Sequence, residues 1–191
     1  MSRISCVLIA AGSFSPVVGK TLIRENILDI LSIPFEEVIT VTDQDTEAYY
    51  QALRDLPLKV THNAESALGQ HSSIRNGLTH LRKYCDGVLI LRADDINQDV
   101  SVLQDMIRLF RSQLGKSIVH PSGRTLNLQP MLIPREFIPD ILQFEDGDYD
   151  CSYLLKRYPV RVAPLEVASN SYETDIGPSD DFSITLVSQH G

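Results

Sequence analysis

Apolar residues in this chain fall into short continuous runs that alternate with longer amphipathic stretches. The clearest run covers residues 87–91, Gly-Val-Leu-Ile-Leu, and is followed closely by two adjacent carboxylates, Asp94 and Asp95. A continuous apolar run bounded by turn signals is typical of a strand that is buried on both faces of a parallel sheet. A second such run predicts a strand over residues 4–11, and shorter stretches rich in Val, Ile and Leu predict extended segments over residues 37–42, 58–61, 117–120, 129–133 and 160–163.

The segments between these runs carry apolar residues at helical spacing. Over residues 100–114, for example, Leu103, Met106, Ile107, Phe110 and Leu114 fall on one side of a helix. The same signals predict helices over residues 22–31, 45–53, 135–144 and 150–156, one that starts near Ser72, and a last short one after Ser179. Strands that alternate with helices in this way are typical of βαβ units, so we predict an α/β domain with a parallel sheet.

Size and composition favour one soluble domain. The chain has 191 residues, of which 43% are hydrophobic, enough for a single core over residues 1–191. The net charge of −8 without a Lys/Arg cluster argues against a nucleic-acid binder, although backbone N–H groups can hold a small anion on an acidic protein. Three scattered cysteines without a C-x-x-C pair are typical of a reducing compartment. The first apolar run is too short for a bilayer, and no signal-peptide pattern precedes it, so we expect a cytoplasmic protein without a membrane segment.

Two of the predicted strands end in residues suited to binding phosphate or metal. In open α/β sheets the ligand crevice lies beyond the carboxyl ends of the strands. Asp94 and Asp95 are expected at that edge, either as oxygen ligands of a divalent cation or as caps of the next helix, and the pattern alone leaves both roles open. The first strand runs into Gly12 and Ser13, a small turn that can present backbone N–H groups to phosphate, although such turns also follow strands for steric reasons.

A long polar connection interrupts the alternation of strands and helices between residues 63 and 78. It leads into a helix through Ser72 and Ser73, and either serine is a candidate N-cap that leaves backbone N–H groups open at the start of that helix. Loops of this length in a compact α/β domain often bind ligands. The alternative is a capped helix that follows an ordinary surface loop.

Six segments of the chain, in the same order, resemble motifs of the molybdopterin nucleotidyltransferase family, the MobA-like cytidylyl- and guanylyltransferases. Residues 8–13 resemble L-A-A-G-x-S, and Asn63 with residues 69–78 resembles N…G-x-x-S-S-(I/L)-x-x-G-L. Residues 91–96 are similar to L-x-x-D-Q-P, and Gly123 with residues 129–132 is similar to G…G-H-P-x-L/F. Residues 147–155 resemble G-D-x-G-x-R-x-L-L, and residues 175–182 resemble D-I-D-T-P-E-D-L. The resemblance covers nearly the whole chain.

This resemblance implies a doubly wound α/β domain with a mostly parallel, Rossmann-like sheet. It implies transfer of a nucleoside monophosphate from CTP or GTP to a phosphate-bearing acceptor such as molybdopterin, with release of pyrophosphate. Mg²⁺ would be held by Asp94, with Asp95 as a second carboxylate. The nucleotide would be bound by Ala10, Ala11, Gly12, Ser13, Asn63, Gly69, Ser72 and Ser73. The oligomeric state stays open.

The chain departs from the family pattern in the first loop. The family continues x-R-M-G-x-x-K, whose arginine and lysine bind the triphosphate, whereas residues 14–23 here read Phe-Ser-Pro-Val-Val-Gly-Lys-Thr-Leu-Ile. In one register Lys20 takes the place of the family's lysine. In the other, which we prefer, residues 16–23 match a later segment, L-P-V-G-G-K-T-L-L, and the part with the arginine and lysine is deleted. Gly177 also replaces the second aspartate of D-I-D.

These departures leave two hypotheses for the function. Losing a cation that stabilises the transition state costs phosphoryl transfer a factor of roughly 10³–10⁵ in related chemistries. The chain is therefore either a nucleotidyltransferase of weakened or lost activity, with Asp94 and Lys20 as its candidate catalytic residues, or an accessory protein. The accessory protein would bind a nucleotide or cofactor on the same scaffold without turnover.

Overall fold

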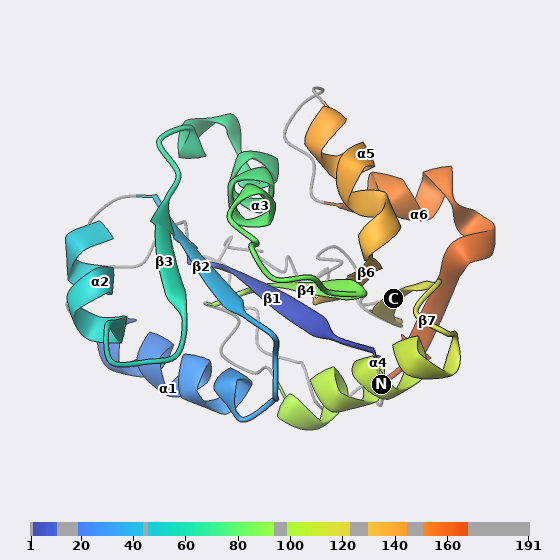
Figure 1. Ribbon diagram of the computed structural model, residues 1–191, viewed down its shortest axis with the longest axis horizontal. Helices are drawn as coiled ribbons and strands as arrows, with labels where there is room; N and C mark the ends of the chain where they lie inside the picture. Colours follow the sequence, from blue (N-terminus) through green and yellow to red (C-terminus); the bar gives the residue numbers. More distant parts are fainter. Residues whose placement is uncertain are drawn as a thin grey trace, which may run out of the picture.

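One mixed sheet with helices on both faces makes up the structure (Figure 1). The computed structural model describes residues 2–10, 19–43, 46–93, 99–122, 130–144 and 151–167. In this part of the chain seven strands follow one another across the sheet in the order β3-β2-β1-β4-β6-β5-β7. The strands are β1 (Ile4–Ile9), β2 (Val38–Thr42), β3 (Lys59–His62), β4 (Gly87–Arg92), β5 (Ile118–Ser122), β6 (Met131–Pro134) and β7 (Val162–Glu166).

The helices lie close to their predicted positions. They are α1 (Gly19–Leu31), α2 (Thr46–Leu53), α3 (Gln70–Thr79), α4 (Val100–Ser112), α5 (Ile138–Gln143) and α6 (Tyr153–Arg157), with short 3₁₀ turns η1 (Ser66–Leu68), η2 (Arg135–Phe137) and η3 (Pro159–Arg161). The segment predicted as one helix over residues 135–144 is divided into η2 and α5, and Pro139 stands in the first turn of α5, where its missing N–H is tolerated. The helix predicted after Ser179 lies outside the described residues. No helix of the described ranges is long and apolar enough to cross a membrane.

The sheet is mostly parallel, as predicted, and β6 is its reversed strand. β1 pairs in parallel with β2 and β4, and β2 pairs in parallel with β3, whereas β6 runs antiparallel to both β4 and β5. The connection from β5 to β6 spans only residues 123–130. A parallel crossover needs about a dozen residues or more, so a connection this short joins antiparallel neighbours.

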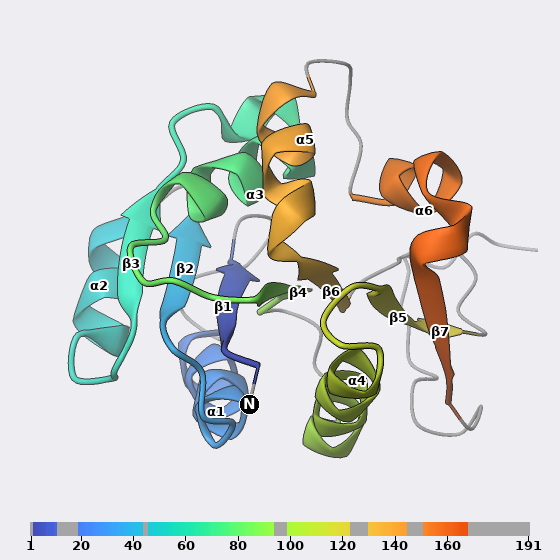
Figure 2. The ribbon, with the colours of Figure 1, turned by 45° about the vertical axis from the view of Figure 1, so that its right-hand side comes forward.

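The continuous apolar runs are explained by burial of the sheet on both faces. Along β1, Cys6 and Leu8 belong to a core shared with α1, α2 and α4, while Val7 and Ile9 belong to a second core shared with α3, α5 and α6. Figure 2 shows α3, α5 and α6 on one side of the sheet, opposite α1 and α4. The doubly wound α/β fold expected from the sequence is therefore confirmed.

Gly77 brings α3 unusually close to the sheet and gives a test of this packing. A Cβ atom at this position would lie 2.4 Å from Val7 Cγ1 and 3.0 Å from Val41 Cγ2. We expect Gly77→Ala to lower the free energy of unfolding by about 1–3 kcal/mol, because overpacking outweighs the helix propensity that alanine gains. Urea denaturation measures the change.

A double-mutant cycle identifies the contact that is responsible. Val7→Ala removes the γ-methyl groups that the new Cβ would meet, so the destabilisation caused by Gly77→Ala is expected to shrink in the Val7→Ala protein. An equal loss in both proteins would show that the close approach is not the cause.

Candidate functional site

The candidate site lies where β1 and β4 end side by side at the carboxyl edge of the sheet. From β1 the chain continues outward through β2 and β3, and β4 then returns to pair with the other side of β1. A reversal of strand order of this kind opens the crevice in which open α/β sheets bind ligands. The Ala10 N–H donates to the Val41 carbonyl at 2.8 Å, and the Ala93 N–H donates to the Ile9 carbonyl at 2.9 Å.

Ala10 and Ala93 therefore mark two adjacent points from which the chain continues beyond the sheet. After Ala10 come residues 11–18, with the predicted site residues Ala11, Gly12 and Ser13; after Ala93 come residues 94–98, with Asp94 and Asp95. These five predicted residues lie outside the described part of the chain, and their roles stay predictions. Ala10 itself is buried, 6% exposed, so only its backbone is a plausible contact for a ligand.

Lys20 lies at the beginning of α1, which starts at Gly19. Its backbone is part of the helix, and its side chain is outside the described residues. The preferred register places Lys20 in the segment that leads into this helix, and the choice between the two registers stays a prediction. Whether the ammonium group reaches a phosphate stays a prediction.

Asn63, which directly follows β3, connects the carboxyl end of this strand to the first turn of α3 by side-chain hydrogen bonds. Its side-chain Nδ2 donates to Ser72 Oγ at 2.8 Å and to Ser73 Oγ at 2.9 Å, while its Oδ1 accepts from the Glu65 N–H at 3.0 Å. Its own N–H donates to the Thr42 carbonyl at 2.7 Å. Asn63 is 3% exposed, and a buried amide with both polar ends bonded is a rigid connector. Three predicted nucleotide-binding residues, Asn63, Ser72 and Ser73, are thus brought together by direct hydrogen bonds.

A second asparagine holds the middle of α3 to the same strand. Asn76 Nδ2 donates to the His62 carbonyl at 3.1 Å, and the Thr61 hydroxyl lies 3.2 Å from Asn76 Oδ1. The Thr61 hydroxyl also lies 3.2 Å from His80 Nε2, at the end of α3. The N-terminal part of α3 is therefore held at a defined position beside the carboxyl end of β3.

The start of α3 differs from the prediction. Neither Ser72 nor Ser73 is its N-cap: the helix begins at Gln70, and the N-cap is Gly69, with φ 91°. Glycine adopts this positive φ at little cost, and the chain can therefore turn sharply into the helix. The Ser72 hydroxyl hydrogen-bonds back to the Gly69 and Glu65 carbonyls from inside the first turn. Gly69 has no side chain that could accept a hydrogen bond from the first turn of α3, and the N-terminus of a helix favours an anionic group.

An aromatic cluster beside this helix start was missed by the sequence analysis. His71 is 5% exposed, and its Nε2 lies 3.2 Å from the Phe144 carbonyl oxygen. The Phe144 and Tyr153 rings stack with centroids 4.0 Å apart, and both meet the His71 ring edge-on. Burial raises the pKa of the Tyr153 hydroxyl, so this group stays protonated at neutral pH. The cluster joins α3, α5 and α6, and no spacing in the sequence relates its three members.

Comparisons with known proteins agree with this arrangement. A family model described as the MobA-like NTP transferase domain matches residues 13–162. No curated protein sequence matches the chain. Among solved structures, 4-diphosphocytidyl-2C-methyl-D-erythritol synthase from Anaerococcus prevotii DSM 20548 has a TM-score of 0.72 and 15% identity over 89% of each chain.

Two further structures share the fold. CMP:2-keto-3-deoxy-manno-octonic acid synthetase, complexed with CTP, has a TM-score of 0.67 and 12% identity over 88% of this chain and 91% of its own. Rv0371c from Mycobacterium tuberculosis H37Rv, in a complex with manganese, has a TM-score of 0.64 and 14% identity over 87% of each chain. At these identities the likeness shows the fold.

Removing the Asn63 side chain tests its role as a connector. We expect Asn63→Ala to lower the free energy of unfolding by about 1–3 kcal/mol, because two serine hydroxyls and the Glu65 N–H lose a buried partner. Asn26→Ala is the matched control, since Asn26 makes one long bond, 3.4 Å, to the Ala93 carbonyl. Equal losses in the two variants, measured by urea denaturation, would contradict this role.

Proposed function

Because the chain belongs to the MobA-like NTP transferase domain family, we propose that it transfers a nucleoside monophosphate from CTP or GTP to a phosphate-bearing acceptor. In this reaction an acceptor oxygen attacks the α-phosphorus, the bond to the bridging oxygen of the β-phosphate breaks, and pyrophosphate leaves. In such a reaction the protein positions the two substrates and neutralises the negative charge of the phosphates, and no covalent intermediate with the protein is needed. Molybdopterin is our candidate acceptor, from the motifs of the sequence.

The adjacency of the β1 and β4 ends is the observation that carries this proposal. The Ala93 N–H donates to the Ile9 carbonyl at 2.9 Å, so the Gly12-Ser13 turn and the Asp94-Asp95 pair both follow from this point of the sheet. One segment offers backbone N–H groups and the other offers carboxylates. The N–H groups would bind the phosphate oxygens of a nucleotide, and the carboxylates would bind the cation that accompanies these phosphates.

Mg²⁺ is the cation that we assign to Asp94, with Asp95 as the second carboxylate. Paired carboxylates are hard oxygen donors of the kind that Mg²⁺ prefers, and the bound ion would neutralise phosphate charge. Within the described ranges no group of three or more His, Cys, Asp or Glu side chains could hold a metal. The assignment to Asp94 and Asp95 rests on the resemblance of residues 91–96 to L-x-x-D-Q-P. The manganese in the related Rv0371c structure supports divalent-metal use among proteins of this fold.

The segment from Gly69 to Ser73 is proposed to border the nucleobase or the acceptor. The N-terminus of α3 is held next to the carboxyl end of β3 by the Asn63 hydrogen bonds. A site held by buried, satisfied hydrogen bonds keeps its geometry as ligands bind, which is what a positioning mechanism needs. Asn63 is therefore proposed to act as a positioning residue for Ser72 and Ser73.

A non-catalytic binding protein is the second candidate, and one observation favours it. The segment between β1 and α1, residues 11–18, reads Ala-Gly-Ser-Phe-Ser-Pro-Val-Val and contains no arginine or lysine. Pyrophosphate release with CTP or GTP, molybdopterin and Mg²⁺ distinguishes the two candidates. Turnover supports the transferase, whereas calorimetric binding of nucleotide without turnover supports the accessory role. The absence of both nucleotide binding and turnover would exclude both candidate functions.

The two carboxylates after β4 are expected to contribute unequally. Asp94 occupies the position of the family's metal-binding aspartate, while Asp95 stands where the family has glutamine. Asp94→Ala should abolish Mg²⁺-dependent nucleotide binding, and Asp95→Gln should retain most of it, because the first ligand is lost only in the former. Titration calorimetry with and without Mg²⁺ measures both. Equal loss in the two variants, or no loss in either, would contradict the assignment.

Lys20→Ala separates the two registers of the first loop. If Lys20 only begins α1, its charge is slightly unfavourable with the helix dipole, and its removal should change the free energy of unfolding by less than about 1 kcal/mol. The Lys20→Ala protein should then bind nucleotide as tightly as the control variant Lys116→Ala does. Lys116 lies near the amino ends of β1 and β4, away from the proposed nucleotide site. A tenfold or greater loss of affinity, on the order of 1.4 kcal/mol, would instead make Lys20 a phosphate ligand.

A further inference from the structure

Three distant segments meet at the amino edge of the sheet, opposite the candidate active site. Arg3 directly precedes β1, Tyr84 lies shortly before β4, and Arg135 directly follows β6. Because β1 and β4 are parallel and β6 is antiparallel to β4, these three positions share one edge. Asp86 connects Arg3 and Arg135 by two hydrogen bonds from their backbone N–H groups. Its side-chain Oδ2 accepts from the Arg3 N–H at 2.7 Å, and its carbonyl oxygen accepts from the Arg135 N–H at 2.9 Å.

Two arginine side chains lie against the ring of Tyr84. The guanidinium carbon of Arg3 is 4.5 Å from the ring centroid, and that of Arg135 is 4.8 Å away. Tyr84 is 53% exposed, so the stack stands at the surface. Within the described part of the chain, neither guanidinium has an ion pair with a carboxylate. Cation–π contact therefore holds two positive charges in place while their hydrogen-bond donors stay available.

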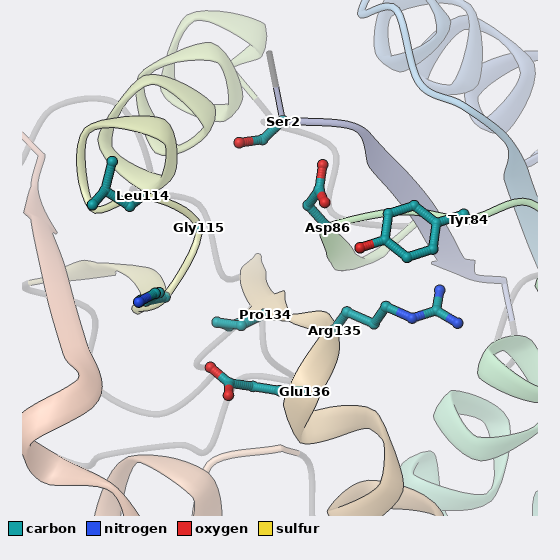
Figure 3. Close-up of a pocket in the computed structure, with 9 residues that line it drawn as sticks. Ser2, Tyr84, Asp86, Leu114, Gly115, Pro134, Arg135 and Glu136 are labelled. Carbon is teal, nitrogen blue, oxygen red and sulfur yellow. The ribbon is translucent and has the colours of Figure 1, made fainter.

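An open cavity of about 420 Å³ adjoins this stack (Figure 3). In Figure 3, Tyr84 and Arg135 lie together on one side of the cavity and Leu114 lies on the opposite side. Leu114 was predicted on the apolar side of α4, but the helix ends at Ser112, and Leu114 is 80% exposed. Its φ of 56° turns the chain away from the helix and is an unfavourable backbone conformation for a leucine. The turn that follows α4 thus presents a large apolar side chain to solvent at the rim of this cavity, whose lining also includes Lys116 and Arg135.

The acidic residues of this cavity already have partners. Asp86 accepts the Arg3 N–H, and Glu136 forms an ion pair with Arg161. Lys116 adds a further positive charge to the lining. Asp86 keeps its own negative charge, whereas Arg3, Lys116 and Arg135 have no ion pair with a carboxylate in the part of the chain that the structure describes, so positive charge exceeds negative charge here although the whole chain carries −8.

We propose that this amino-edge patch, defined as Arg3, Tyr84, Leu114, Lys116 and Arg135, docks a partner protein through a segment that carries carboxylates next to an apolar side chain. Carboxylates would bind the two guanidiniums, and the apolar side chain would cover Leu114 and the Tyr84 ring. Arginine and tyrosine are among the residues that dominate the binding energy of protein interfaces. A free inorganic anion would satisfy the charges but would leave Leu114 exposed.

The location separates this interaction from the chemistry at the other edge. The patch lies at the amino ends of β1 and β4, and the candidate nucleotide site lies beyond their carboxyl ends. A bound partner can therefore leave the crevice open to small molecules. The docking proposal does not depend on the proposed transferase activity.

Selection from a phage-displayed library of random dodecapeptides, with the full chain immobilised, tests the proposal. Enriched sequences are expected to combine at least two carboxylates with a nearby aliphatic or aromatic residue. A synthetic peptide of the enriched sequence is then titrated against Arg3→Gln/Arg135→Gln, which should bind at least about tenfold more weakly. Arg54→Gln/Arg108→Gln removes the same charge from exposed positions elsewhere and should bind as the unmodified protein does. Circular dichroism of both double variants shows that they fold.

Several results would overturn the proposal. These are a failure of the library to yield binders, enrichment of peptides without carboxylates, and equal binding by both double variants. Displacement of the peptide by millimolar inorganic phosphate alone would identify a site for small oxyanions instead. A dimer in size-exclusion chromatography that only Arg3→Gln/Arg135→Gln disrupts would make the occupant a second copy of this chain.

Discussion

The parallel pairing of β1 with β4 is the constraint on which both surfaces of interest depend. Six residues of each strand are in register, from Ile4 opposite Gly87 to Ile9 opposite Arg92. Both strands are buried almost throughout, so this pairing lies at the centre of the sheet. The pairing aligns two strand ends at the carboxyl edge, where the proposed nucleotide crevice begins. It also aligns two strand starts at the amino edge, where Arg3 and Tyr84 meet.

The position of α3 beside this strand pair is set by both apolar and polar contacts. Gly77 lets the helix lie against Val7 and Val41, and this contact sets its distance from the sheet. Asn63 and Asn76 then set its position along β3 through hydrogen bonds to side chains and main chain. Hydrogen bonds are directional whereas apolar contacts are not, so the asparagines define how the helix start faces the crevice.

The positive charge is placed differently from what the proposed transfer from a nucleoside triphosphate would lead one to expect. Residues 11–18 supply no cation, and Arg92, at the end of β4, carries one at the carboxyl edge. At the opposite edge two guanidiniums stand on one tyrosine ring without a carboxylate partner among the described residues. We attribute the charge at this edge to the proposed docking of a partner protein rather than to catalysis.

The sequence by itself determined the elements whose burial is encoded locally. Continuous apolar runs revealed β1, β2 and β4, because strands covered on both faces need no polar positions, and helical spacing revealed α1 and α4. Six ordered motifs were sufficient to indicate the family, whose model matches residues 13–162.

Tertiary structure alone decided features that rest on contacts between segments distant in the chain. The serines expected to cap α3 instead lie inside its first turn, because Gly69 supplies the positive φ and Asn63 supplies a partner across the loop. The stacking of Phe144 on Tyr153, and of two arginines on Tyr84, follows from the order and direction of strands in the sheet. Periodicity records which face of an element is buried, but not which distant residue will cover it.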